Sequence, residues 1–263
     1  MDARPLFERW RAISFVAPAH DNPSMNIRHH VALAALAISF ASVALPATGQ
    51  EYRLDSARGL TLVDVQAEPV SMDGKRGLRV SISTDAKQRI AQAPDGQPAS
   101  LEQLAVIDGS DFSNGVIEAE IAGAPAPDAP PGARGFVGIA FRVKADLRTY
   151  DAFYLRPTNG RADDQLRRNH AAQYISHPAW PWYRLRDETP GKYESYVDLE
   201  PGKWTRIRIE VQGDHARLFV HGQSQPTLVV NDLKSGADGR GAIALWLDSG
   251  TIAHFRALRV RGS

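Results

Sequence analysis

Short segments in which apolar and polar residues alternate recur along the chain from residue 51 to the C-terminus. In residues 203–211 (KWTRIRIEV), for example, Ile207, Ile209 and Val211 share one face of an extended chain and the arginines share the other. Alternation with a period of two is typical of a strand that buries one face. Because parallel strands need crossover helices and none is visible, the pattern predicts an antiparallel β-sandwich or barrel.

Turn-forming glycine and asparagine residues separate the remaining predicted strands. Residues 101–106 lie in a polar stretch and could form one short helix. The other predicted strands are residues 51–62, 78–83, 116–121, 136–143, 150–156, 216–220, 227–230, 241–248 and 252–260.

The N-terminal part of the chain reads as a targeting segment rather than as part of the fold. Residues 25–49 combine a basic start with an apolar run of fifteen residues, Val31–Leu45, and with small residues before Gln50. This is the pattern of a secretory signal peptide. An uncleaved membrane anchor is the alternative, although a membrane span needs about 20 apolar residues. Residues 1–24 are interpreted as a disordered upstream extension, with Met25 as the true start.

Residues 50–263 have the length of one domain. The chain has no cysteine and a net charge of +1, so composition supports neither a disulfide framework nor a nucleic-acid partner. With the signal peptide, this predicts a secreted or periplasmic bacterial protein that contacts no membrane after cleavage. The oligomeric state is left open.

Aromatic and basic side chains concentrate in residues 150–196, around a predicted long loop over 157–192. Long ordered loops of this kind are usually functional. The aromatic residues are Tyr150, Phe153, Tyr154, Tyr174, Trp180, Trp182, Tyr183, Tyr193 and Tyr196.

Three pieces of the chain resemble the concanavalin A-like jelly-roll superfamily. The nearest branch is the bacterial 3-keto-disaccharide hydrolase domain family, followed by laminin G-like and glycoside hydrolase family 16-like domains. The resemblance rests on Asp111–Glu118 before the Gly138–Arg142 strand, on Gly202–Ile209 with the Val220–Gly222 turn, and on Gly241–Leu245 closing into His254–Leu258.

The resemblance implies two curved antiparallel sheets with a ligand on the concave face. It implies a carbohydrate-binding protein, and it leaves open whether the protein is also an enzyme that hydrolyses a glycosidic or 3-keto-disaccharide linkage. The chain lacks the Glu-x-Asp-x-x-Glu motif of family 16 glucanases. The alternative is a non-catalytic laminin G-like module that binds a protein or cell-surface partner.

The predicted binding floor consists of side chains that share one parity on neighbouring strands: Arg142, Tyr154, Arg156 and Trp246. Aromatic faces stack on sugar rings, and arginine forks bind hydroxyls or carboxylates. The other interpretation is a solvated outward face.

The predicted wall over this floor comes from the long loop: Tyr174, His177, Trp180, Trp182 and Tyr183. A miniature core of the loop's own aromatic residues is the alternative for the tryptophans. Arg168 and Asn169 belong to the mixed-charge segment 161–170, which is predicted to recognise an anionic or polyhydroxyl ligand, with a solvated turn or short helix as the alternative.

Catalysis of glycoside chemistry needs two carboxylates, or a carboxylate with a histidine. We predict His177, Asp163 and Glu118 for these roles, although sequence spacing fixes no pair. No cofactor or metal site is predicted. Asn231, Asp232, Asp238 and Asp248 could hold Ca²⁺, but turn formation accounts for them as well.

Overall fold

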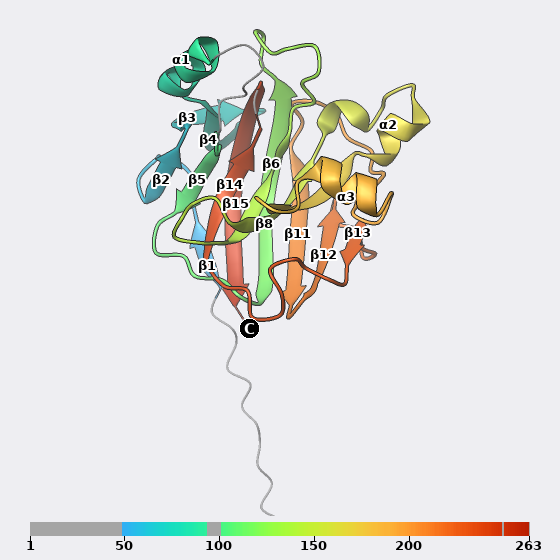
Figure 1. Cartoon of the computed structure of the whole chain (residues 1–263). Coiled ribbons are helices and arrows are strands. Elements are labelled where there is room, and N and C mark those ends of the chain that lie inside the picture. The colour runs from blue at the N-terminus through green and yellow to red at the C-terminus, as the bar shows by residue number, and fades with distance from the viewer. Residues whose placement is uncertain (1–48, 94–100, 249, 263) are drawn as a thin grey trace, which may run out of the picture. The chain divides into compact units, whose positions relative to one another are not determined.

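The computed structural model of the protein describes residues 49–93, 101–248 and 250–262. These residues form two antiparallel sheets, which confirms the predicted jelly-roll β-sandwich (Figure 1). Residues 1–48, which contain the predicted extension and almost all of the signal peptide, lie outside the described part. The signal peptide therefore stays a prediction. Within the described residues, no helix is long and apolar enough to cross a membrane.

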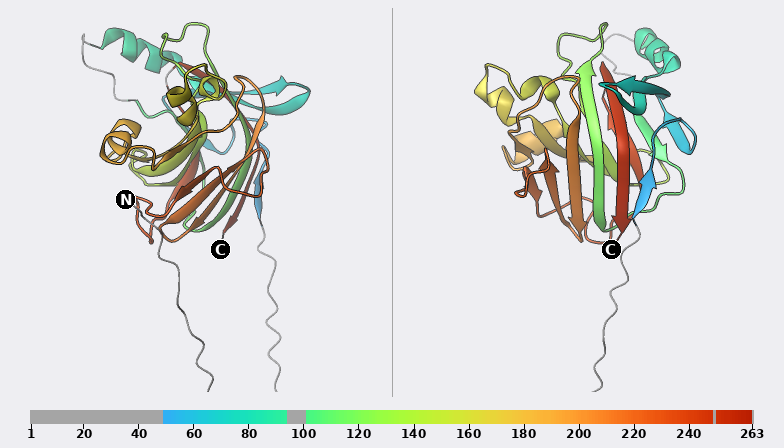
Figure 2. Two further views of the ribbon diagram at one scale, coloured as in Figure 1. Left: turned by 90° about the vertical axis from the view of Figure 1, so that its right-hand side faces the viewer. Right: turned by 180° about the vertical axis from the view of Figure 1, so that it is seen from behind.

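The first sheet faces the viewer in the right-hand panel of Figure 2. Its long central strands pair along nearly their whole length, and β1 (Gln50–Tyr52) pairs with one of them, β15. The order is β13 (Leu228–Val230), β12 (His215–Val220), β11 (Thr205–Gln212), β6 (Gly115–Pro125), β15 (Thr251–Gly262), β4 (Lys75–Ile82) and β3 (Val65–Met72).

The second sheet carries the candidate site. Its strand order places segments far apart in sequence side by side, as in β7, β14 and β5. The order is β10 (Glu194–Ser195), β9 (Ala172–His177), β8 (Tyr150–Leu155), β7 (Val137–Val143), β14 (Ala242–Leu247), β5 (Leu104–Ile107) and β2 (Leu60–Val63).

Helices are short and lie at the ends of strands. They are α1 (Thr84–Gln92), the 3₁₀ turn η1 (Pro157–Asn159), α2 (Gln165–Asn169) and α3 (Trp182–Glu188). The Ser83 side chain caps α1 by accepting a hydrogen bond from the Ala86 N–H at 3.2 Å. The helix predicted over 101–106 is wrong, because residues 104–106 belong to strand β5, which pairs with β14 and β2.

The predicted loop over 157–192 also needs correction. It contains η1, α2 and α3, and between the two α-helices it returns to the second sheet as strand β9, paired with β8. Alternation was obscured there because β9 is buried on both faces.

Close approach of the two sheets fixes which side of the second sheet faces inward. A Cβ added at Gly123 in β6 would lie only 2.7 Å from Cγ1 of Val137 in β7, so Val137 points toward the first sheet. Alternation then turns Ile139, Phe141 and Phe153 inward as well. We call the opposite side, which carries Tyr154 and the other residues of its parity, the outer face. Figure 2 (left) shows α3 on this side.

The space between the sheets holds a row of buried aromatic rings that runs across the second sheet. Neighbouring ring centroids lie 5.5–6.2 Å apart, within the range of favourable aromatic contacts. The row consists of Phe112, Phe141, Phe153, Tyr174 and Tyr193.

Candidate functional site

A hollow of about 780 Å³ lies at the edge of the outer face, where β7 begins and β8 and β14 end. Basic and aromatic side chains dominate its lining, and two carboxylates complete it. The lining residues are Gly132, Arg134, Phe136, Arg156, Asn159, Asp164, Leu166, Arg167, His170, Trp182, Arg186 and Asp248.

Three of the four residues predicted for the floor come together beside this hollow. The rings of Tyr154 and Trp246 lie with centroids 4.6 Å apart, and the Arg156 guanidinium lies 5.0 Å from the Tyr154 ring centre. Arg156 also donates a hydrogen bond to the Tyr154 hydroxyl at 2.7 Å. All three side chains are buried, and of the three Arg156 alone is among the residues that line the hollow.

Gly138 separates Tyr154 from Trp246 across the sheet, because both strands pair with it. A Cβ at this position would lie 2.2 Å from the Phe153 carbonyl oxygen and 2.6 Å from Cβ of Tyr154. We expect Gly138→Ala to lower the free energy of unfolding by about 1–3 kcal/mol, the usual cost of overpacking. Urea denaturation followed by tryptophan fluorescence measures the loss.

Gly132→Ala is the matched control, because a Cβ added at Gly132 meets open space. Equal stability of the two variants would contradict the close approach at Gly138.

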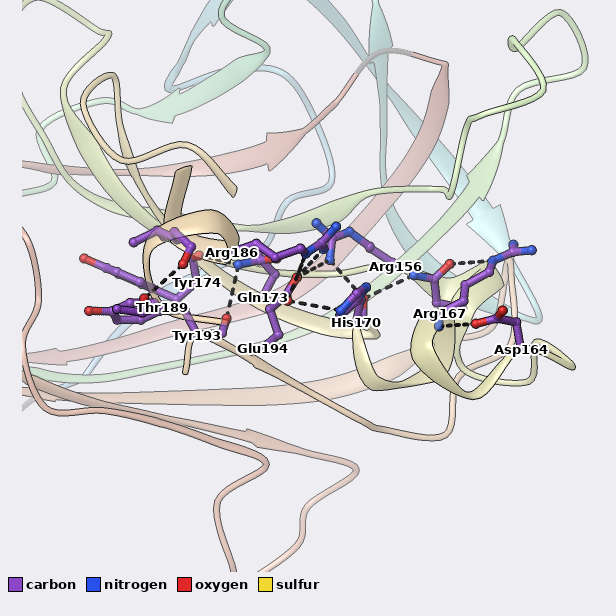
Figure 3. A network of polar contacts seen from close by, with 12 residues as sticks. Arg156, Asp164, Arg167, His170, Gln173, Tyr174, Arg186, Thr189, Tyr193 and Glu194 are labelled. Atoms are coloured by element: carbon purple, nitrogen blue, oxygen red, sulfur yellow. Dashed lines mark hydrogen bonds and ion pairs between the residues drawn. The ribbon is translucent and has the colours of Figure 1, made fainter. Parts of the chain in front are cut away.

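One buried carboxylate organises the polar end of the site (Figure 3). Glu194 Oε1 lies 3.3 Å from Nη1 of Arg156, and Glu194 Oε2 lies 3.3 Å from Nε2 of His170. Arg186 from α3 adds a bidentate contact to the same carboxylate. Glu194 thus joins β10 to β8, to the end of α2 and to α3.

His170 is held in place through both its backbone and its side chain. Its carbonyl accepts hydrogen bonds from Arg156 Nη1 at 3.0 Å and from Asn159 Nδ2 at 3.2 Å. Burial lowers the pKa of His170, and the charges of Arg186 and Arg156 lower it further, whereas Glu194 acts in the opposite direction. The imidazole is therefore neutral at pH 7.

The carboxylate of Glu194 also selects the tautomer of that neutral ring. Nε2 faces Glu194 and must carry the hydrogen, which leaves Nδ1 as the basic nitrogen of His170. Nδ1 of His170 has no hydrogen-bond partner among the described residues. A neutral histidine oriented by a carboxylate is the arrangement of a general base.

Trp182 forms the aromatic wall of the hollow. Its ring lies 4.7 Å from the Arg186 guanidinium and 5.7 Å from that of Arg156, and the residue stays 42% exposed. Tyr183 touches Trp182 edge to face but does not line the hollow. Trp180 contacts the side chains of Arg184 and Lys234, packs against the main core and does not line the hollow.

Arg142, predicted for the floor, does not lie on the outer face. Its backbone has a φ of +57° next to a register shift between β14 and β7, which reverses the side-chain parity. The guanidinium therefore points between the sheets and donates to the carbonyls of Ser113, Gly213 and Gly236. Arg142 is 1% exposed, so it is a structural residue and cannot reach a ligand in the hollow.

The prediction that Tyr174 belongs to the wall is also wrong. In β9 it points into the core, where its hydroxyl donates to Asp151 Oδ1 at 2.7 Å and accepts from the Lys234 N–H. It is fully buried and has no access to ligand.

The three residues predicted for catalysis are not brought together. His177 lies at the other end of β8 and β9 from the hollow, stacked on Tyr150, with Nδ1 3.8 Å from Oε2 of Glu102. Asp163 is exposed between η1 and α2 and does not line the hollow. Glu118 belongs to β6 in the other sheet and pairs with Arg261. They cannot act as one catalytic group.

Arg168 and Asn169, predicted as ligand contacts, do not line the hollow. Arg168 donates to the Tyr196 hydroxyl at 2.8 Å, and Asn169 accepts from Gln165 on the surface of α2. Burial raises the pKa of Asp232, but the hydrogen bonds that its carboxylate accepts from Lys192, Tyr193 and Lys234 outweigh burial and lower the pKa to about 2. Among the described residues, no group of three or more His, Cys, Asp or Glu side chains could hold a metal ion.

The sequence patterns predicted no specific role in the site for His170 or Glu194. His170 stands in a segment of mixed charge that also suits a solvated turn, and Glu194 lies 24 positions further along the chain. Their contact depends on the pairing of β9 with β10, for which the sequence carries no local signal.

Comparison with known proteins identifies one family. Residues 82–261, more than half of the chain, match the family described as the 3-keto-alpha-glucoside-1,2-lyase-like domain. No curated protein matches the chain significantly.

Solved structures with a similar chain course have low sequence identity. The carbohydrate-binding module CBM66 from Bacillus subtilis is 10% identical, with a TM-score of 0.45, over 75% of this chain and 95% of that one. A β-1,3-1,4-glucanase (lichenase) from a mouse hindgut metagenome is 12% identical, with a TM-score of 0.43, over 82% and 99%. These similarities are too distant to carry a functional argument.

Proposed function

Because the chain belongs to the family of 3-keto-alpha-glucoside-1,2-lyase-like domains, we propose that it binds a carbohydrate in the hollow and cleaves a 3-keto-glycoside there. One observation carries the proposal. A neutral His170, oriented by Glu194, lines a hollow that also presents guanidinium groups and an exposed tryptophan face.

The reaction that we propose begins at C2 of the sugar. The C3 carbonyl acidifies the C2 proton, and a base removes it. The electrons of the C2–H bond form a C1–C2 double bond, while the glycosidic C1–O bond breaks. The leaving oxygen takes up a proton and departs as an alcohol. A base and groups that stabilise negative charge on the C3 oxygen are what this chemistry needs.

The residues of the hollow suit these requirements. Nδ1 of His170 is the proposed base, and Glu194 stabilises the imidazolium that forms when the proton is taken up. Arg156 lies beside the same carboxylate and is held rigidly by Tyr154, Glu194 and the His170 carbonyl. Its guanidinium is fixed in advance and can stabilise developing negative charge without rearrangement.

Proton NMR in D₂O on methyl 3-keto-α-glucoside tests the reaction. We expect the wild-type protein to release methanol and to exchange the C2 proton for deuterium. Binding of the sugar without methanol release or exchange would contradict the lyase and favour the alternative, a non-catalytic laminin G-like module.

Trp182→Ala tests the binding wall in the same assay. We expect the dissociation constant for the sugar to rise about tenfold, because the exposed ring supplies the apolar surface on which a sugar ring stacks. Tyr183→Ala is the matched control, since Tyr183 is more exposed but lies outside the hollow. Equal affinities of the two variants would place the sugar elsewhere.

A further inference from the structure

The hollow contains two arginines that have no carboxylate partner among the described residues. Arg134 donates from Nη1 to the carbonyls of Pro131 and Ala133, both at 3.2 Å. Arg167 donates from Nε to Asn159 Oδ1 at 3.0 Å and from Nη2 to Thr158. Both guanidiniums are therefore held in place by neutral acceptors, which fix their positions and leave their charges uncompensated.

Both arginines also retain unused donors. A guanidinium carries five N–H groups. Within the described residues, Nε and Nη2 of Arg134 and Nη1 of Arg167 have no hydrogen-bond partner. Both side chains are only partly exposed and line the hollow, so a ligand inside it can accept from them.

The positive charges are close enough to influence one another. Burial lowers the pKa of Arg134, and the charges of Arg167 and Arg156 lower it further. Like charges gathered around one hollow repel, and an anion placed between them relieves that repulsion. Arg156 already shares Glu194 with Arg186 and His170, whereas Arg134 and Arg167 share no such group.

The two carboxylates of the lining do not supply that anion. Asp164 caps α2, with its Oδ1 accepting from the Arg167 backbone N–H at 2.6 Å, and no hydrogen bond or ion pair joins its carboxylate to the Arg167 guanidinium. Burial, with the charge of Asp248 as a smaller influence, raises the pKa values of Tyr150 and Tyr154. Neither carboxylate is among the influences on the pKa of Arg134.

We infer that the sugar held in the hollow carries a carboxylate, as a uronic acid residue does, and that Arg134 and Arg167 bind it. A planar guanidinium fork matches a carboxylate in a bidentate geometry, better than it matches a sugar hydroxyl. This inference rests on the proposed carbohydrate function and specifies its substrate class. It assigns to Arg134 and Arg167 a role in specificity and leaves the proton transfer to His170.

Calorimetric titration of the full chain with three methyl glycosides tests the inference: the α-glucuronide, the neutral α-glucoside and the α-glucoside 6-sulfate. We expect the glucuronide to bind at least tenfold more tightly than the neutral glucoside, and this preference to shrink as salt concentration rises. Equal binding of glucuronide and glucoside overturns the inference and leaves the carbohydrate function standing. Binding of neither sugar overturns the inference, and the carbohydrate function falls with it if methyl 3-keto-α-glucoside does not bind either. Tighter binding of the sulfate overturns the choice of a carboxylate.

Variants of the two arginines test whether the carboxylate of the sugar binds at Arg134 and Arg167. We expect Arg134→Gln and Arg167→Gln each to weaken glucuronide binding about tenfold or more and to change glucoside binding less than twofold. Arg134→Lys keeps the charge without the fork and should retain part of the preference. Arg217→Gln is the control, because Arg217 is exposed on β12 in the other sheet. Unchanged glucuronide affinity in folded Arg134→Gln and Arg167→Gln, checked by circular dichroism, overturns the inference.

Discussion

Replacing Arg142 by methionine is expected to lower the free energy of unfolding by about 4 kcal/mol. The Arg142 guanidinium makes five hydrogen bonds, to the carbonyls of Ser113, Gly213 and Gly236 and to the Ser235 hydroxyl. Methionine keeps the apolar stem but leaves these partly buried acceptors without their donors. A buried acceptor without a partner costs about 1–3 kcal/mol.

The position of Arg142 adds to the effect. These hydrogen bonds hold its backbone in the left-handed region, at a φ of +57°, and that strain is no longer offset when they are lost. Urea denaturation of the full chain measures the change, with Arg217→Met on the exposed surface as the control. A loss below about 1 kcal/mol would show that the guanidinium does not join the two sheets.

His170→Ala is expected to reduce kcat/KM for the 3-keto-glycoside by about 10²–10⁴-fold, the usual contribution of a general base. Sugar affinity should change little, because Trp182 and the arginines remain. Added imidazole should restore part of the lost rate by occupying the space of the side chain. If the folded His170→Ala variant turned over the substrate at the wild-type rate, His170 would not be the base.

The pH dependence follows from the protonation of the same residue. The base is active when neutral, and burial together with Arg186 and Arg156 lowers its pKa below the ordinary value of about 6.5. The rate should therefore be level above about pH 6.5 and fall as the pH decreases through the pKa of His170. Glu194→Gln removes a charge that raises this pKa, so its falling limb should move to lower pH.

Strands were predictable from the sequence where only one face is buried. In β11, the inward residues Ile207 and Ile209 alternate with arginines that reach solvent or carboxylates. This alternation of apolar and polar residues is therefore visible in the sequence. In β9 both faces are covered, so the alternation vanishes and the segment resembles a loop. The fold class was therefore recoverable, whereas the strand inside the long insertion was not.

The candidate site was predictable only where side chains alternate regularly between the two faces of a strand. Tyr154, Arg156 and Trp246 follow the regular alternation, and the structure places them together. Arg142 shares their parity in the sequence, but the positive φ at this residue turns its side chain to the opposite side of the sheet. Irregular backbone of this kind has no signature in a non-glycine residue. The contact between His170 and Glu194 likewise depends on long-range pairing.

The attachment of three cationic or ionisable side chains to Glu194 has a consequence for local unfolding. Arg156 directly follows strand β8, whereas His170 and Arg186 belong to the helical segments on either side of β9. Opening of either helical segment removes an ion-pair partner from the Glu194 carboxylate and weakens the attachment of the other segment. We therefore expect the two segments to open together. Hydrogen exchange should show one shared opening event for α2 and α3, and the shape of the hollow should be maintained or lost as a unit.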